Sequence, residues 1–169
     1  MVKTSAGLLM YNLENNELKF FLIHPGGPFW KNKDLGAWSI PKGEKDNEAE
    51  GLLDVARREF NEETGISSPN DNSHYIELGK IKQKSGKIVY ALAFKGNFSG
   101  KLNCTSFIDI EWPTKSGKFI KIPEVDKAEM LNINEAKKKI NSCQAELIDR
   151  LIEIIGFKNE SKMNQERLF

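Results

Sequence analysis

Residues 58–66 read Arg-Glu-Phe-Asn-Glu-Glu-Thr-Gly-Ile, and they contain the most informative pattern in the chain. Glu59, Glu62 and Glu63 are spaced at i, i+3 and i+4, so on a helix their carboxylates fall within one arc roughly 100° wide. Like charges at this spacing destabilise an isolated helix by a few tenths of a kcal/mol. A hard divalent cation reverses that sign, because it prefers several oxygen ligands. Taken alone, an acidic helix face is more often simply solvated.

The residues before this stretch predict the helix that carries it. Leu53, Ala56 and Phe60 are apolar at helical spacing within 50–64, and Gly65 stands where a left-handed C-cap ends a helix. We expect this apolar stripe to face the core. The three carboxylates are expected on the side away from it.

The rest of the chain predicts a mixed α/β layered domain. Residues 5–11 and 18–24 are apolar runs separated by the polar turn 14–16, which predicts a hairpin. The further expected extended segments are 37–40, 75–83, 88–97, 107–112 and 129–133, and the further expected helices are 134–140 and 144–155. From residue 157 the chain is polar, and we expect this tail to be partly disordered.

Composition sets broad limits on the function. The chain has 169 residues, which suits one domain, and a formal net charge of +1, which favours neither a nucleic-acid polymer nor a membrane as partner. Its apolar runs are too short to cross a bilayer, and its first residues do not form a convincing signal peptide. Cys104 and Cys143 are isolated, as expected of reduced thiols. A cytoplasmic enzyme, monomeric or homodimeric, fits these features.

The acidic stretch belongs to a longer motif. Gly43 and Glu50 lie upstream, and seven residues separate Glu50 from Arg58. This pattern resembles the Nudix box, GX5EX7REUXEEXGU, at every fixed position. Two departures occur: six residues rather than five separate Gly43 from Glu50, and Phe60 replaces the bulky aliphatic residue. An extra loop residue costs little, but it leaves the role of Glu50 open.

The resemblance implies a fold, a cofactor and a set of ligands. The Nudix fold is an α/β/α sandwich around a mixed β-sheet, and its box forms a loop, helix and loop that bind a divalent cation. By resemblance, Glu59, Glu62 and Glu63 are the expected ligands of Mg²⁺ or Mn²⁺, with the Gly43 carbonyl as a further ligand. Arg58 would orient a carboxylate through its planar fork. A plain i,i+4 ion pair between Arg58 and Glu62 is compatible with that role.

Many Nudix hydrolases add a carboxylate from a downstream loop, as a ligand or general base. Glu124, within 122–126, is the candidate here, because it shortly precedes the expected strand 129–133. Glu111 and Asp126 are alternatives. Each of the three could instead be an exposed surface residue.

The flanking sequence resembles a narrower group. The segments 24–30, 34–44, 111–117 and 123–126 are similar to a MutT-related bacterial subgroup of nucleotide pyrophosphohydrolases, and 38–44 also resembles diadenosine polyphosphate hydrolases. The resemblance extends to about residue 155. We therefore expect a Nudix domain over 1–156 and a polar tail over 157–169.

Three further side chains are candidates for substrate binding. Lys42, beside the metal loop, would neutralise a polyphosphate, although a solvated lysine is equally compatible. Trp30, next to Phe29, would stack on a base, although anchoring a loop is the commoner use of such aromatics. Lys84, on the turn 83–86, would meet distal phosphates, although lysines on turns usually only solubilise.

These residues predict a nucleotide-type small molecule as the substrate. The expected reaction is metal-dependent hydrolysis of a phosphoanhydride bond in a nucleoside diphosphate linked to a moiety X, preferably a dinucleoside polyphosphate or a nucleoside triphosphate. ADP-ribose or a nucleotide sugar is the alternative within the enzyme class. A nucleotide sensor without turnover is the alternative outside it, although the acidic motif is intact here. An enzyme acting on RNA 5′ ends is disfavoured because no basic stripe is seen.

Overall fold

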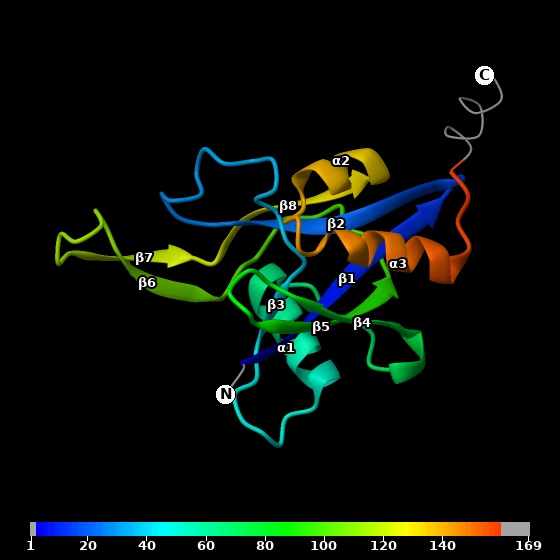
Figure 1. The fold of residues 1–169 in the computed structure, drawn as a ribbon, viewed down its shortest axis with the longest axis horizontal. Coiled ribbons are helices and arrows are strands. Elements are labelled where there is room, and N and C mark those ends of the chain that lie inside the picture. The colour runs from blue at the N-terminus through cyan, green and yellow to red at the C-terminus, as the bar shows by residue number, and fades with distance from the viewer. Residues whose placement is uncertain (1–2, 160–169) are drawn as a thin grey trace.

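A computed structural model describes residues 3–159 of the protein. A six-stranded mixed β-sheet forms its centre (Figure 1). Five strands lie in the order β4-β5-β1-β2-β8, and β3 pairs with the start of β1. Only β1 and β5 are parallel neighbours. The strands are β1 (Thr4–Glu14), β2 (Glu17–Pro25), β3 (Lys42–Glu44), β4 (Tyr75–Lys82), β5 (Ile88–Lys95) and β8 (Val125–Asn132).

Helices cover both faces of the sheet (Figure 1). Helix α1 (Leu52–Thr64) packs on one face, where Leu8 and Met10 of β1 meet Phe60. Helices α2 (Ile133–Lys139) and α3 (Ala145–Ile155) cover the other face, and a single 3-10 turn, η1 (Asn72–His74), precedes β4. Because side chains alternate along β1, its residues feed both apolar clusters. The predicted α/β/α sandwich is confirmed.

A predicted hairpin turn and a predicted helix end are confirmed. The β1–β2 hairpin turns at Asn15 and Asn16, whose φ angles are 50° and 60°. Gly65 ends α1 in the left-handed region at φ 75° and donates its N–H to the Asn61 carbonyl at 2.7 Å. This C-cap stops the helix two residues after the last glutamate of the motif.

A two-stranded ribbon projects from the sheet (Figure 1), and half of it was not predicted. Strand β6 (Phe107–Glu111) matches the expected segment and pairs antiparallel with β7 (Phe119–Pro123). The lysines at 118 and 121 interrupt the apolar pattern of β7, which hid this strand in the sequence. Strand β8 also begins earlier than expected, at Val125, because it pairs with the whole end of β2.

The segments around these elements differ in smaller ways from the predictions. Residues 37–40 make only isolated bridges, Ile23 with Ser39 and Trp38 with Ile140, and form no strand. Phe157, the first residue of the expected polar tail, packs against the α3-side cluster, and residues 160–169 lie outside the described part. Within residues 3–159, the structure contains no helix long and apolar enough to cross a membrane.

Candidate active site

The three glutamates of α1 differ sharply in exposure. The side chains of Glu59 and Glu62 are 13% and 42% exposed, whereas Glu63 is 6% exposed and buried. The expectation that all three face away from the apolar stripe is therefore wrong for Glu63. Glu63 follows Ala56 by seven residues, which is close to two full helical turns, so it projects in nearly the same direction as that buried alanine.

The guanidinium of Arg58 connects Glu50 at the start of the motif to the acidic residues of α1. It donates to both Glu50 oxygens, at 2.9 and 3.2 Å, to Glu59 Oε1 at 2.7 Å and to the Glu44 carbonyl at 3.1 Å. Its Nη1 also lies 3.6 Å from Glu62 Oε2, the expected i,i+4 pair. These bonds raise the pKa of Arg58, with the Glu50 hydrogen bond as the largest cause. Glu50 thus reaches Arg58 despite the longer spacer.

Gly43 leaves space that Glu59 fills. A Cβ placed on Gly43 would lie 2.0 Å from Glu59 Cδ, closer than real atoms approach. Strand β3 holds Gly43 there by pairing it with Ala6 of β1. The glycine of the motif therefore lets the metal loop approach the acidic end of α1.

The buried Glu63 lies beside the half-buried Lys42. The backbone N–H of Lys42 donates to Glu63 Oε2 at 3.1 Å. Burial raises the pKa of Glu63 to about 8; the Lys42 charge opposes this shift, and Glu59 and Glu124 reinforce it. Burial likewise lowers the pKa of Lys42, and Glu63 opposes that shift. Lys42 is half-buried and lines a cavity together with Glu63 and Glu124.

Glu124 faces this cluster from the junction of β7 and β8. Its N–H donates to the Ser106 carbonyl, and its carbonyl accepts from Gly26 N–H, both at 2.9 Å. Within residues 3–159, no donor is paired with its carboxylate. The charge of Glu124 influences Lys42 and Glu63, so the three groups share one electrostatic environment.

The two rivals of Glu124 are engaged elsewhere. Glu111 Oε1 accepts from the Gly117 N–H at 2.8 Å within the ribbon turn. Asp126 Oδ1 lies 2.7 Å from Nδ1 of the buried His24. Among these three carboxylates, Glu124 is therefore the one that shares a cavity with Glu63 and has no donor within residues 3–159.

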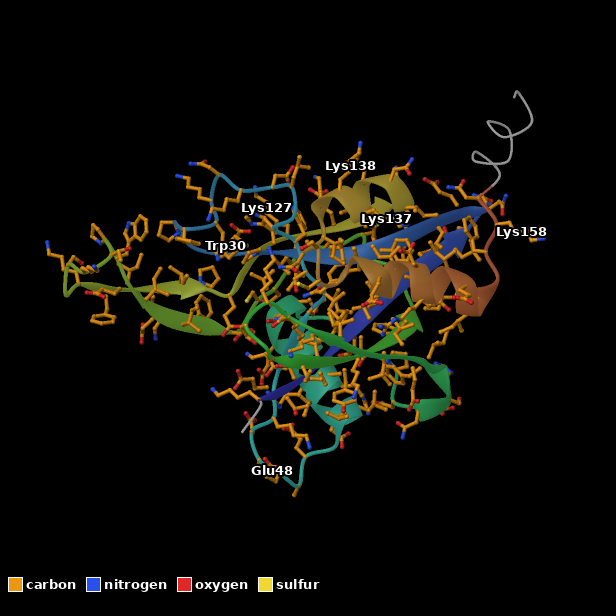
Figure 2. All side chains as sticks on the ribbon, viewed as in Figure 1. Trp30, Glu48, Lys127, Lys137, Lys138 and Lys158 are labelled. Atoms are coloured by element: carbon orange, nitrogen blue, oxygen red, sulfur yellow. The ribbon has the colours of Figure 1, made fainter. Side chains whose placement is uncertain are left out.

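Two cavities meet beside Glu124. One, of about 500 Å³, lies between the loop after β2 and the β6–β7 ribbon, and Figure 2 shows Trp30 beside the base of that ribbon. The other, of about 190 Å³, is lined by polar groups that include Lys42, Glu63 and Gln83. Glu124 and Trp30 line both cavities. Lys84 is exposed and lines neither cavity. Its neighbour Gln83 lines the smaller one.

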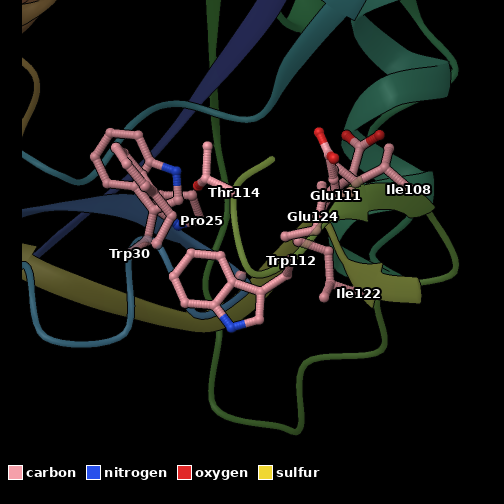
Figure 3. Close-up of a pocket in the computed structure, with 11 residues that line it drawn as sticks. Pro25, Trp30, Ile108, Glu111, Trp112, Thr114, Ile122 and Glu124 are labelled. Atoms are coloured by element: carbon pink, nitrogen blue, oxygen red, sulfur yellow. The ribbon is translucent and has the colours of Figure 1, made fainter. Parts of the chain in front are cut away.

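The larger cavity contains residues that were missed in the sequence. These are Ile108, Ile110, Trp112 and Ile122 of the ribbon, which line it beside Glu124 (Figure 3). The alternation of apolar residues at 108, 110 and 112, followed by the polar turn 114–117, was a signal for such a ribbon.

The carboxylate groups fit a divalent cation in their chemistry. Oxygen ligands suit Mg²⁺ and Mn²⁺, and burial raises the pKa values of Glu59 and Glu63, so a bound cation would offset the cost of their negative charge. Within residues 3–159, no three acidic, histidine or cysteine side chains already converge as a metal cage. Glu59 is directed to Arg58 and Glu63 to Lys42 instead, so metal binding requires these side chains to rotate.

Comparison with known proteins agrees with this architecture. The structure of the Shewanella oneidensis NrtR NUDIX domain in complex with ADP ribose is similar, with a TM-score of 0.65 at 13% identity over 92% of this chain and 89% of that one. A Caenorhabditis elegans Ap4A hydrolase binary complex gives 0.59 at 16% identity over 90% and 98%. At these identities the likeness shows the fold.

Sequence comparison establishes the family. An uncharacterised 17.7 kDa protein of enterobacteria phage T4 is 36% identical over 130 residues, which are 74% of this chain and 80% of that protein. The family model of the NUDIX domain matches residues 1–151, a range that includes the α1 glutamates, Arg58 and Glu124. With this match over most of its length and the box helix in place on an α/β/α sandwich, the chain belongs to the Nudix family of hydrolases.

Proposed function

We propose that the protein hydrolyses a phosphoanhydride bond in a nucleoside diphosphate linked to a moiety X, with Glu59, Glu62 and Glu63 holding the divalent metal ion. The family acts on nucleotide-linked substrates and generally uses divalent ions. The observation that carries the proposal is the cluster at the acidic end of α1, where the buried Glu63 shares one cavity with the half-buried Lys42 and Glu124. Mg²⁺ or Mn²⁺ is the expected ion, and the Gly43 carbonyl is a further candidate ligand.

Each residue has a distinct part in this proposal. A divalent ion, when bound, supplies charge that stabilises the phosphates and activates a water for attack on phosphorus. Glu124 accepts a proton from the attacking water, since its carboxylate is near Glu63 and has no competing donor. Lys42 offsets phosphate charge. Arg58 positions Glu59 by a hydrogen bond from the same guanidinium that binds Glu50.

The small polar cavity favours a phosphate group as its occupant. Its volume is about 190 Å³, and Lys42 and Gln83 offer donors there. A nucleoside triphosphate or a dinucleoside polyphosphate remains the preferred substrate, with ADP-ribose or a nucleotide sugar as the alternative. Lys84, exposed on the β4–β5 turn, contacts at most the outer end of a long polyphosphate.

A substrate screen tests the proposal. Purified protein is incubated with the nucleoside triphosphates, diadenosine tetraphosphate, ADP-ribose and nucleotide sugars, with Mg²⁺ or with EDTA, and the products are separated by chromatography. We expect at least one substrate to be cleaved with Mg²⁺ and none with EDTA. Turnover that persists in EDTA contradicts the metal mechanism, and binding without any turnover supports a nucleotide sensor instead.

A further inference from the structure

The cavity under the β6–β7 ribbon has an apolar wall that the hydrolytic mechanism does not use. Ile108 pairs with Ile122 in the ribbon, so both side chains project from the same face, and the next residues on that face, Ile110 and Trp112, extend the wall. Ile122 is buried, and Trp112 is half-buried. An apolar surface of this size beside a phosphate site is suited to a part of the substrate that is not phosphate.

The loop after β2 supplies the facing aromatic residues. Phe29 and Trp30 line the same cavity, with ring centroids 5.5 Å apart and planes at 78°. Lys33 Nζ lies 3.7 Å from the Phe29 ring centroid and 4.9 Å from that of Trp30. Lys33 therefore makes cation–π contacts with both rings and helps to hold them at the cavity.

The cavity is polar at one end and aromatic at the other. Figure 3 shows the indole rings of Trp30 and Trp112 on the left and the carboxylates of Glu111 and Glu124 on the right. In the described part of the chain, neither indole N–H has a hydrogen-bond partner, so both remain available to a ligand. A molecule that extends along the cavity places a planar group at the indoles and its phosphates at Glu124.

We propose that this cavity binds the nucleobase of the substrate by stacking on Trp112 and Trp30, which makes the β6–β7 ribbon one wall of the base site. The volume of about 500 Å³ is ample for a base with its ribose, whereas the neighbouring polar cavity of about 190 Å³ is much smaller. Stacking tolerates different bases because each has a π-face. The direction of the ligand rests on the proposed function, which places the phosphates at Glu124.

Product binding without metal separates this inference from the proposed hydrolysis. Isothermal titration calorimetry in EDTA measures the Kd of AMP for wild type, Trp112→Ala, Trp112→Phe and Phe119→Ala. Phe119 is the matched control, since it lies on the same ribbon, is 69% exposed and does not line the cavity. We expect Trp112→Ala to weaken AMP binding about tenfold, Trp112→Phe to stay within about threefold and Phe119→Ala to have no effect.

Other ligands identify what the cavity recognises. Adenosine should bind with the same dependence on Trp112, and ribose 5-phosphate should be insensitive to Trp112→Ala. Equal affinity of Trp112→Ala and wild type for AMP overturns the inference, as does failure of wild type to bind any nucleoside monophosphate. Binding that depends on Trp112 in a protein without Mg²⁺-dependent turnover supports the base site and rejects the proposed hydrolysis. Mg²⁺-dependent turnover in a protein whose AMP binding does not depend on Trp112 supports the proposed hydrolysis and rejects the base site.

Discussion

The backbone N–H of Lys42 donates a 3.1 Å hydrogen bond to Oε2 of Glu63, and this bond joins the first residue of β3 to the last turn of α1. One donor does not replace the water that a carboxylate loses on burial. Burial accordingly raises the pKa of Glu63 to about 8. An ionised carboxylate buried in this position costs stability, and a bound cation would offset that cost.

Glu63→Gln should stabilise the protein in EDTA at alkaline pH. The folded pKa of Glu63, about 8, lies above its ordinary 4.5, so the penalty is absent below pH 4.5, grows as the pH rises to 8 and is complete above it. The amide removes a penalty on the order of a few kcal/mol. Thermal unfolding from pH 5 to 9 should show wild type losing Tm relative to the variant. Parallel Tm curves would show that Glu63 is charged at no such cost.

Glu62→Gln should lower Mg²⁺-dependent turnover by at least about two orders of magnitude while the protein stays folded. Its side chain is 42% exposed, and within residues 3–159 its carboxylate pairs with Arg58 alone, at 3.6 Å, so the amide removes charge and little packing. Glu48→Gln is the control, because Glu48 is an exposed acidic residue in the loop before α1 (Figure 2). Turnover and circular dichroism measure the two effects. A Glu62→Gln enzyme near the wild-type rate removes Glu62 from the metal site.

The local signals of the sequence predicted most of the fold. Asn15 and Asn16, Gly65 and the apolar stripe around Phe60 each determine structure within a few residues, and each is found as expected. The burial of Glu63 was also present in its spacing from Ala56, but the acidic pattern suggested a solvated face. Its raised pKa comes first from burial by the packed sheet and then from the charges of Glu59 and Glu124, and no local pattern contains this long-range packing.

The remainder of the candidate site depends on long-range pairing. Gly26 and Glu124 are joined by a backbone hydrogen bond across about a hundred residues of chain, and Trp30 and Trp112 line one cavity only because of that closure. The sequence singled out Trp30 for its loop of prolines and glycines. No local pattern indicated that Trp112 would line the same cavity as Trp30.

Arg58→Lys should reduce turnover by about tenfold or more. The guanidinium bonds Glu50, Glu59 and the Glu44 carbonyl at once, and the single ammonium of lysine lacks the planar fork that this geometry needs. Arg57→Lys is the matched control, since the neighbouring Arg57 donates to the exposed Asn70 at 2.6 Å instead. Steady-state kinetics at saturating Mg²⁺ compare the two variants. Equal rates for both would show that Arg58 contributes charge alone.

Glu124→Gln should lower kcat more than Glu111→Gln does. Glu124 has no donor on its carboxylate within residues 3–159 and lines both cavities, so it is free to take a proton from water. Glu111 also lines the larger cavity, but its carboxylate accepts from Gly117 N–H and closes the ribbon turn. Its loss should therefore affect binding through the ribbon, as a rise in KM. The two amide variants have the same size and lose the same charge, so electrostatics alone does not separate them. The ratio of their kcat values at several pH values measures proton transfer, and a larger loss in Glu111→Gln would move the role of general base from Glu124 to the ribbon.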